Sequence, residues 1–340
     1  MDNGYGYNKQ CFPNRVLVTG GCGFIGSSLV KRLTDNHKIS QIRVLDNIST
    51  GTEEDLAEVT IYETQSADKI FEDCCGTILI KGDIRNAALI DQCAKGIDCI
   101  IHLAANTGVG PSVENPRLDM ENNVIGTFNA LEAARKNKVS KFIFASSGAP
   151  IGAASPPIHE QLAPHPVSPY GSSKLTGEGY CSSYFHTFGI QTISLRFGNV
   201  YGPRSKNKSS VIAKFIKNAL AGIPCHIYGD GTQTRDFIYI DDLIKAITQS
   251  MQMPVGGEIF QIAAGVERTV LEVAKLIQEK LSQHGIDMSI SYASPRLGDV
   301  KRNFSDTSKA KRVLGWQVDV QLHEGIERTI SYFLKKNSTS

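Results

Sequence analysis

The chain has 340 residues, which is long enough for two domains or for one large α/β domain with a smaller cap. It is 41% hydrophobic and 21% charged, as is typical of a soluble globular protein, and its net charge of +2 gives no electrostatic reason to expect nucleic acid or a membrane surface as a partner. The eight cysteines show no CxxC or Cys/His spacing, so we expect reduced thiols and no metal site.

The N-terminus and the length of the apolar runs indicate where the protein works. Residues 1–13 are polar and contain no apolar core, so we expect a flexible N-terminus and no signal peptide. No apolar run reaches the roughly 20 residues that a membrane-spanning helix needs. We therefore expect a cytoplasmic protein with no membrane partner.

The first elements predicted along the chain are a strand, a glycine turn and a helix. Residues 15–19 form a short β-branched run, and apolar residues recur at helical spacing over 27–34. Between them stand Gly20, Gly23 and Gly26. Glycines at this spacing let the backbone approach a pyrophosphate, and the start of the following helix presents free N–H groups and a positive dipole end.

A second strand, over 42–45, ends in Asp46, twenty residues after the last of these glycines. An acid at this distance suits the free ribose diol of adenosine and repels a 2′-phosphate. The strand, the turn, the helix and the acid together predict a site for NAD rather than for NADP.

The middle of the chain alternates strands with helices after an acidic, partly helical connection over 52–76. This rhythm predicts a parallel sheet with a ligand at the carboxyl ends of its strands. His102 lies within an apolar strand, and we interpret it as a core histidine and not as a catalyst. The predicted elements are strands over 77–80, 99–103, 141–145 and 191–197, the last of which closes the sheet, and helices near 86–95 and over 113–136.

A helix that follows Ser168 is expected to carry the catalytic groups. Ser168 suits the N-cap, and Pro169 suits the first helical position, where no N–H is needed. Tyr170 and Lys174 then lie on one face, one turn apart. An ammonium there favours the phenolate and lowers the tyrosine pKa toward the operating pH of an acid/base catalyst. Ser147, at the end of an earlier strand, is either a substrate-binding hydroxyl beside Tyr170 or an ordinary turn serine.

The rhythm changes in the last third of the chain, which we interpret as a smaller domain over the edge of the sheet. It spans 198–335, and the chain is expected to return to the first domain, 14–197, near 236–264. The predicted elements here are a helix over 211–220, a strand-like segment over 234–242 that leads into a helix, and helices near 269–283 and 322–335.

Two arginines in this part carry donor groups suited to an anion. Arg235 and Arg296 are planar forks that match phosphate or carboxylate oxygens. Ion pairing on the surface with Asp236 or Asp299 is their alternative role.

Several motifs stand in a fixed order along the chain. They are Gly20-x-x-Gly23-x-x-Gly26, Asp46, Gly82-Asp83-Ile84, His102-Leu103-Ala104-Ala105, Ser146-Ser147, Tyr170-x-x-x-Lys174, Arg196-Phe197-Gly198-Asn199-Val200-Tyr201-Gly202-Pro203 and Gly229-Asp230-Gly231-Thr232-Gln233-Thr234-Arg235-Asp236-Phe237. With this order and spacing, the chain from about residue 14 to 335 resembles the extended short-chain dehydrogenase/reductase superfamily. The nearest group is the nucleotide-sugar epimerases and dehydratases, in particular the UDP-hexose 4-epimerases. The resemblance implies an α/β fold, namely a Rossmann-type doubly wound parallel sheet with a smaller C-terminal substrate-binding domain.

The resemblance also implies a mechanism and a homodimer. Tyr170 would take the proton of the sugar 4-hydroxyl, Lys174 would bind the nicotinamide ribose, and Ser147 would hydrogen-bond the 4-oxygen. Hydride passes from C4 to a tightly held NAD and returns to the other face of a 4-keto sugar, in a reaction typical of polysaccharide biosynthesis. The helices over 113–136 and 168–186 would pair with those of a second copy in a four-helix bundle.

Binding residues follow from the same resemblance, which assigns none to a metal. For the cofactor they are Gly20, Gly23, Phe24, Ile25, Gly26, Asp46, Asn47, Ser49, Thr50, Gly51, Asp83, Ile84, Leu103, Ala104, Ala105, Thr107, Asn123, Tyr170 and Lys174. For the UDP-sugar they are Val109, Ser147, Gly148, Ala149, Asn199, Val211, Phe215, Tyr228, Arg235, Arg296, Asp299 and Asn303.

The chain departs from the family pattern after its catalytic serine. Residues 149–152 read Ala-Pro-Ile-Gly where the family often has Val-Tyr-Gly, in a loop that touches the sugar. The 4,6-dehydratases place an Asp-Glu pair directly after the catalytic hydroxyl residue, but Gly148 and Ala149 stand there and neither can move a proton. Glucuronate 4-epimerases tend to have threonine where this chain has Asn199, which argues against a uronate.

Asn303 falls where the family has a gate near the sugar C2 substituent. A tyrosine at the gate crowds out an N-acetyl group, so the smaller asparagine favours UDP-N-acetylglucosamine and UDP-N-acetylgalactosamine, with UDP-glucose and UDP-galactose as further substrates. The alternatives are a UDP-glucuronate 4-epimerase, a dehydratase or reductase on the same scaffold, and a non-catalytic NAD-binding regulator, because a fold alone does not determine function.

Overall fold

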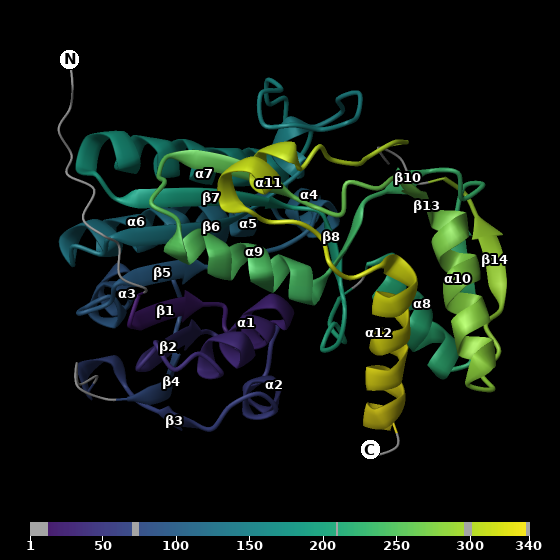
Figure 1. Ribbon diagram of the computed structural model, residues 1–340, viewed down its shortest axis with the longest axis horizontal. Helices are drawn as coiled ribbons and strands as arrows, with labels where there is room; N and C mark the ends of the chain where they lie inside the picture. The colour runs from purple at the N-terminus through teal and green to yellow at the C-terminus, as the bar shows by residue number, and fades with distance from the viewer. Residues whose placement is uncertain (1–12, 70–74, 209, 296–300, 338–340) are drawn as a thin grey trace.

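The computed structural model describes residues 13–69, 75–208, 210–295 and 301–337. Its centre is an eight-stranded sheet in which each neighbouring pair of strands is parallel (Figure 1). In spatial order the strands are β12 (Glu258–Ile262), β7 (Gln191–Phe197), β6 (Lys141–Ser147), β5 (Cys99–His102), β1 (Arg15–Thr19), β2 (Gln41–Asp46), β4 (Gly76–Lys81) and β3 (Tyr62–Thr64).

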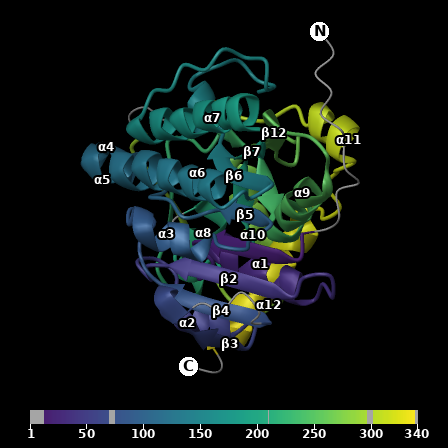
Figure 2. The same cartoon turned by 90° about the vertical axis from the view of Figure 1, so that its left-hand side faces the viewer.

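Helices cover both faces of the sheet (Figure 2). One face carries α1 (Phe24–Thr34) and α9 (Ile240–Gln252), and the other carries α3 (Ala87–Cys93), α6 (Gly126–Lys136) and α7 (Pro169–Phe188). A hydrophobic core lies on each face of the sheet, and successive residues of a strand point alternately into one core and the other. Val16 and Val18 pack on the α1 side, whereas Leu17 packs on the α6 side. The doubly wound α/β fold implied by the sequence is therefore confirmed.

The sheet is wider than the sequence indicated. The prediction that the strand over 191–197 closes the sheet is wrong, because β12 pairs beyond β7, with Phe260 opposite Leu195. At the other edge, β3 lies within the segment predicted to be a connection and pairs with β4. β3 is only three residues long and partly exposed, so its pattern is too short to identify it as a strand.

The helix predicted over 113–136 is divided into several segments. These are α4 (Val109–Glu114), α5 (Pro116–Met120), a π-helical turn (Glu121–Ile125) and α6. The break occurs because Pro116 has no N–H and starts a new helix, which Asn115 caps by accepting a hydrogen bond from Leu118 N at 3.0 Å. π-helical turns are frequent at functional sites, and this one carries the buried Asn123.

The smaller part of the molecule lies beside the ends of the strands, to the right in Figure 1. None of the helices within the described ranges is both long and apolar enough to cross a membrane. The strands of this part are β8 (Asn199–Tyr201) paired with β11 (Phe237–Tyr239), β9 (Cys225–Tyr228) paired with β14 (Ile290–Ala293), and β10 (Thr234–Arg235) paired with β13 (Arg268–Thr269). Its helices are α8 (Val211–Leu220), α10 (Val270–Gln283) and α12 (Leu322–Asn337). α11 (Ser308–Leu314) instead packs against β12 and α9 of the main sheet domain.

Candidate active site

Several predicted site residues meet where the strands of the sheet end. Thr19 of β1 lies opposite Leu45 of β2 on one side and His102 of β5 on the other. Ser147, the last residue of β6, lies opposite Phe197 of β7. The carboxyl ends of these strands thus stand side by side, at the edge where parallel α/β sheets bind ligands.

The glycine turn between β1 and α1 fits a pyrophosphate. Gly20 has φ +72°, which favours glycine, and a Cβ at Gly26 would lie 2.1 Å from the Gly20 oxygen. A Cβ at Gly51 would lie 2.1 Å from the Cys22 oxygen, so the loop after β2 also touches the turn. At Gly23, by contrast, the nearest described atom to a Cβ is the Gly20 oxygen at 3.4 Å, so this position has room for a ligand. Since α1 begins directly after Gly23, its first N–H groups are available to phosphate oxygens.

Asp46 ends β2 beside this turn. Its Oδ2 accepts a hydrogen bond from Cys22 N at 2.9 Å, and its Oδ1 accepts one from Ile48 N at 2.8 Å. Burial raises the pKa of Asp46, and the two hydrogen bonds oppose that shift. Asn47 donates from Nδ2 to Asp83 Oδ2 at 3.2 Å, which joins two more predicted cofactor residues. A fixed carboxylate and this polar pair fit the adenosine end of NAD.

The other predicted cofactor residues lie on neighbouring segments. The Ile84 side chain is buried, and a Cβ at Gly126 of α6 would lie 2.4 Å from its Cδ1, so Ile84 packs against α6. Phe24 and Ile25 open α1, Ser49 and Thr50 are exposed in the loop after β2, and Leu103, Ala104, Ala105 and Thr107 follow β5.

His102 has a partner for each ring nitrogen. Nδ1 lies 2.9 Å from Thr19 Oγ1, and Nε2 lies 3.1 Å from Thr127 Oγ1. Burial lowers the pKa of His102 to about 3, so the ring is neutral. Thr19 Oγ1 also accepts a hydrogen bond from Ala104 N at 3.2 Å, so this network holds the loop after β5. The interpretation of His102 as a core residue is confirmed.

The catalytic residues predicted on α7 lie beside the end of β6. Ser168 caps the helix as predicted, since its Oγ accepts a hydrogen bond from Gly171 N at 3.1 Å. Lys174 is buried, donates from Nζ to the Ala145 oxygen at 2.9 Å, and places Nζ 5.9 Å from the centre of the Tyr170 ring. The Lys174 hydrogen bond to β6 fixes the distance between the helix and the strand that ends in Ser147.

The direction of the tyrosine pKa differs from the prediction. Burial raises the pKa of Tyr170 to about 12, although a hydrogen bond with Ser147 opposes this shift. Burial also lowers the pKa of Lys174 to about 8, against the attraction of Asp119 and Glu178. The prediction that Lys174 sets a low tyrosine pKa is therefore wrong for the protein alone, because removing both groups from water favours their neutral forms.

A buried ion pair lies behind Lys174, one turn further along α7. Glu178 accepts two hydrogen bonds from Arg196 of β7, each at 2.7 Å, and a third from Ser146 Oγ at 2.6 Å. Both side chains of the ion pair are 2% exposed. Both oxygens of the Glu178 carboxylate accept hydrogen bonds from Arg196, so the two opposite charges compensate each other within the core.

The segment that departs from the family pattern forms a short 3-10 turn, Ala149–Ile151, against the first turn of α7. A Cβ at Gly171 would lie only 2.7 Å from the Ala149 oxygen, so the two segments are in backbone contact. A Cβ at Gly148, by contrast, would have no atom of the described residues within 4 Å, so that side of the turn is open. The turn therefore contacts the catalytic helix and leaves space beside Ser147.

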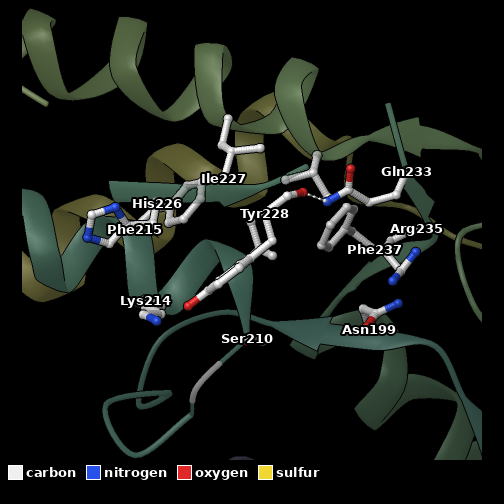
Figure 3. A pocket seen from close by; sticks show the side chains of 12 residues that line it. Asn199, Ser210, Lys214, Phe215, His226, Ile227, Tyr228, Gln233, Arg235 and Phe237 are labelled. Carbon is white, nitrogen blue, oxygen red and sulfur yellow. Dashed lines mark hydrogen bonds between the residues drawn. The ribbon is translucent and has the colours of Figure 1, made fainter. Parts of the chain in front are cut away.

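A cavity of about 180 Å³ lies in the smaller part of the molecule (Figure 3). Five predicted substrate residues line it: Asn199, Val211, Phe215, Tyr228 and Arg235. Asn199 and Arg235 lie toward one end, and Lys214 lies with Tyr228 toward the other, where its Nζ is 6.0 Å from the centre of the tyrosine ring. Asn199 comes two residues after Phe197, which is opposite Ser147, so β7 leads directly from the catalytic edge to this cavity.

Sequence reasoning missed other cavity residues. Lys214 lies three residues after Val211 on the apolar helix α8, a spacing that could have placed it on the same face. Gln233 donates from Nε2 to the Tyr228 oxygen at 2.9 Å and lies within the motif that spans 229–237. The complete set of residues not predicted is Ser210, Lys214, His226, Ile227, Gln233, Phe237 and Val270.

The remaining predicted substrate residues have different outcomes. Arg296 and Asp299 lie outside the described residues. Val109 is 52% exposed at the start of α4. Asn303 donates its backbone N–H to Thr234 Oγ1 at 3.3 Å, which places it next to Arg235 and the cavity wall. Asp236 had been considered as a surface ion-pair partner of Arg235. Its carboxylate instead accepts hydrogen bonds from the backbone N–H groups of Ala264, Gly265 and Ser305, which argues against that ion pair.

A parallel α/β sheet with this glycine turn, an acid after β2 and a Ser/Tyr/Lys set at one edge defines a nucleotide-dependent enzyme of the Rossmann type. Residues 16–263 match the model of the NAD dependent epimerase/dehydratase family. The chain belongs to this family, as the resemblance of its motifs implied, and NAD is its cofactor.

Sequence relatives and solved structures also support this family membership. A UDP-glucose 4-epimerase of Mycolicibacterium smegmatis and a putative UDP-glucose 4-epimerase of Methanocaldococcus jannaschii are each 36% identical to the chain, over 95% of its length and over 99% and 100% of theirs. The crystal structure of a UDP-glucose 4-epimerase from Thermotoga maritima with UDP-glucose is 34% identical and has a TM-score of 0.85, covering 95% of this chain and 99% of that one. A UDP-N-acetylglucosamine 4-epimerase from Methanobrevibacter ruminantium, in complex with UDP-N-acetylmuramic acid, is 30% identical with a TM-score of 0.85, covering 96% and 100%.

Proposed function

We propose that this protein is a UDP-sugar 4-epimerase that interconverts UDP-N-acetylglucosamine and UDP-N-acetylgalactosamine, with UDP-glucose and UDP-galactose as further substrates. The observation that carries the proposal is the path along β7 and β8. It links Ser147, at the catalytic edge, to the cavity lined by Asn199 and Arg235. A nucleoside diphosphate in that cavity would lead its sugar toward Tyr170.

The chemistry needs a group that removes the 4-hydroxyl proton while C4 loses hydride, and NAD supplies the hydride acceptor. Tyr170 takes that proton, and Ser147 hydrogen-bonds the 4-oxygen and the tyrosine. Lys174, held by the Ala145 oxygen, places its ammonium beside the Tyr170 ring, where it would bind the nicotinamide ribose. Because the residues act on one oxygen, the same set serves both directions at C4.

The nucleotide end is held by a different set of groups. Arg235 offers a planar guanidinium to diphosphate oxygens, and Asn199 lies at the same end of the cavity. Phe215 and Tyr228 supply aromatic surface for a base, with the Lys214 ammonium near the ring of Tyr228. Arg296 and Asp299 are proposed to complete the diphosphate site.

The N-acetylated substrate follows from Asn303. Its backbone N–H is held by Thr234, the residue before Arg235, which supports a position close to the substrate. An asparagine there leaves more room than a tyrosine for an N-acetyl group at C2. Gly148 and Ala149 carry no titratable group, which argues against the loss of water at C6.

We also propose a cytoplasmic homodimer that serves polysaccharide biosynthesis. The outer surface of α4 to α7 carries exposed apolar side chains, which in a monomer would face water. These helices lie next to one another in Figure 2, as a four-helix bundle with a second copy requires. The side chains are Val109, Val113, Leu118, Met120, Ile125, Phe128, Tyr180 and Phe188. Sedimentation of the wild type as a dimer, and of Phe128→Arg as a monomer, would support this assembly.

The decisive experiment is NMR of the purified protein with UDP-N-acetylglucosamine and no added cofactor. Growth of the C4-inverted product supports the proposal and shows that NAD is retained through purification. If only UDP-glucose or UDP-glucuronate is converted, the protein is still a 4-epimerase, but the proposal that Asn303 admits an N-acetylated sugar is wrong. A product lighter by one water identifies a dehydratase, and a requirement for stoichiometric NAD identifies a dehydrogenase.

A further inference from the structure

The catalytic helix α7 faces a buried carboxylate that the chemistry above does not use. Asp119 of α5 is 1% exposed, and its Oδ1 accepts a hydrogen bond from Asn123 Nδ2 at 2.9 Å. The same Nδ2 lies 3.1 Å from Ser173 Oγ, which donates to the Tyr170 backbone oxygen at 3.0 Å. Hydrogen bonds therefore join Asp119 to the turn of α7 that carries Tyr170 and Lys174.

The two carboxylates near Lys174 differ in how they are compensated. Glu178 is paired with Arg196 through two hydrogen bonds, and it raises the pKa of Lys174 less than Asp119 does. Asp119 makes no ion pair with any Lys, Arg or His among the described residues, and neither does Lys174 with any acid. Asp119 and Lys174 thus attract each other, and Asp119 exerts the largest attraction on Lys174 among the described residues.

We propose that Asp119 is a positioning residue: it supplies the counter-charge that keeps Lys174 protonated and, through Asn123 and Ser173, holds the turn that carries Tyr170. This inference rests on the proposed function, because it assigns Asp119 a part in the acid/base set of that reaction. The sequence offers no hint of it, since Asp119 lies more than fifty residues before Lys174 and reads as one acid on an amphipathic helix.

The other charged groups around this turn are already balanced or remote. From β7, Arg196 pairs with Glu178, and from β5, His102 is neutral. From the π-helical turn, Glu121 pairs with Arg85 and Arg117 at the surface. From α4, Glu114 is exposed to solvent. Among the described residues, these groups leave Asp119 as the acid without an ion-pair partner that acts on both Lys174 and Tyr170.

Removing the Asp119 charge has a predictable direction at both catalytic groups. Asp119 raises the pKa of Lys174 by attraction and raises the pKa of Tyr170 by repulsion. Its loss lowers both, so Lys174 loses its proton at lower pH and Tyr170 becomes a phenolate at lower pH. A reaction that needs the phenolate and the ammonium together would then move as a whole toward acid, and both limbs of its bell-shaped pH profile would shift in the same direction.

The test compares the pH profile of kcat/KM for epimerisation in the wild type, Asp119→Asn, Asp119→Glu and Asp91→Asn. Asp91 is the matched control, because its carboxylate also accepts a hydrogen bond from an asparagine amide, that of Asn137 at 2.9 Å, but on α3. We expect both limbs of the pH profile of kcat/KM to move to lower pH by roughly one unit in Asp119→Asn. Asp119→Glu and Asp91→Asn are expected to keep both limbs at the wild-type pH.

A second readout does not require turnover. The ultraviolet absorbance of tyrosinate, taken as the difference between each protein and its Tyr170→Phe counterpart with NAD bound, reports the ionisation of Tyr170 alone. Its midpoint is expected to fall in Asp119→Asn even if no UDP-sugar is converted, so failure of the proposed function and failure of this inference are distinguishable. Asp119→Ser, which also removes the charge, replaces Asp119→Asn if that variant does not fold. A merely structural role predicts a lower Tm with unchanged limbs and midpoint in either neutral variant, and this outcome would overturn the inference.

Discussion

The two binding regions of this protein are constructed in different ways. The cofactor region is a single continuous strand, turn and helix whose shape follows from glycines in backbone contact, as the Gly20–Gly26 approach shows. The cavity that we propose for the nucleotide is lined by side chains of β8, α8, β9, β10, β11 and α10, which come from separate stretches of the chain. Local backbone sterics determine the first region, whereas tertiary packing assembles the second. Mutations should therefore act differently in the two, and the following predictions test that difference.

The largest effect is expected between the two regions, at Tyr170, the proposed catalytic tyrosine. Tyr170→Phe keeps the ring and removes the hydroxyl, so kcat should fall by roughly a thousandfold or more while NAD stays bound. Tyr180→Phe, on the same helix, is the control and should keep its activity. The measurements are turnover by NMR and the NAD content of the purified protein. Normal turnover in Tyr170→Phe would contradict the assignment of Tyr170 as the catalytic acid/base.

In the cofactor region, neighbouring glycines should respond differently. Gly26→Ala places a Cβ 2.1 Å from a backbone oxygen, so it should lower the Tm even without NAD. Gly23→Ala has room in the protein alone and should keep the Tm, yet lose roughly 10- to 100-fold in NAD affinity, because an inserted methyl group at a tight contact costs about 1–3 kcal/mol. Calorimetry without NAD and titration with NAD measure the two effects. Equal NAD affinity in Gly23→Ala and the wild type would place the pyrophosphate elsewhere.

In the nucleotide cavity, a single side chain should matter without affecting the fold. Arg235→Ala should raise KM for the UDP-sugar roughly 30-fold, because a hydrogen bond to a charged group contributes about 2 kcal/mol. NAD content should not change. The control is Arg135→Ala on α6. It removes a guanidinium that makes two hydrogen bonds to an anion, the Glu132 carboxylate, far from the cavity in sequence. Equal KM values for the two variants would contradict the diphosphate role.

The smallest effect is expected where the two regions touch. Lys206 pairs with Asp55 at 2.7 Å, and Asn207 donates to the Thr50 oxygen at 2.6 Å, so the loop after β8 holds the segment that follows the cofactor acid Asp46. The double variant Lys206→Ala/Asn207→Ala should release NAD about threefold faster, since partly exposed contacts contribute little each. Lys245→Ala, which breaks the surface pair with Asp319, is the control. NAD loss during timed gel filtration measures the rate, and an unchanged rate would mean that the regions act independently.

Most of the cofactor region could be predicted from sequence because its signals are local. Gly20, Gly23, Gly26 and Asp46 stand within one strand–turn–helix–strand unit, so their order along the chain is also their order in space. β12 lies in the segment near 236–264 where the chain was expected to return to the first domain, but its pairing could not be predicted in the same way. It joins β7 from more than sixty residues away, and a short apolar run does not indicate its partner strand.

The catalytic set shows the same division. The four-residue spacing of Tyr170 and Lys174 is enough to place them on one face of α7, since helix geometry is local. The pKa of Tyr170 was not predicted correctly, because it depends on burial and on Asp119, which is distant in the chain.

The sequence by itself determined the family, the cofactor and the glycine turn, and it predicted Ser147, Tyr170 and Lys174 as the catalytic residues. Each of these rests on residues close together in the chain or on motifs in a fixed order. Only the tertiary structure decided which strand forms the edge of the sheet, which side chains join Arg235 around the cavity, and how strongly Tyr170 and Lys174 hold their protons. The physical reason is that desolvation and cavity shape depend on atoms brought together by packing, and the spacing of residues along a chain does not specify them.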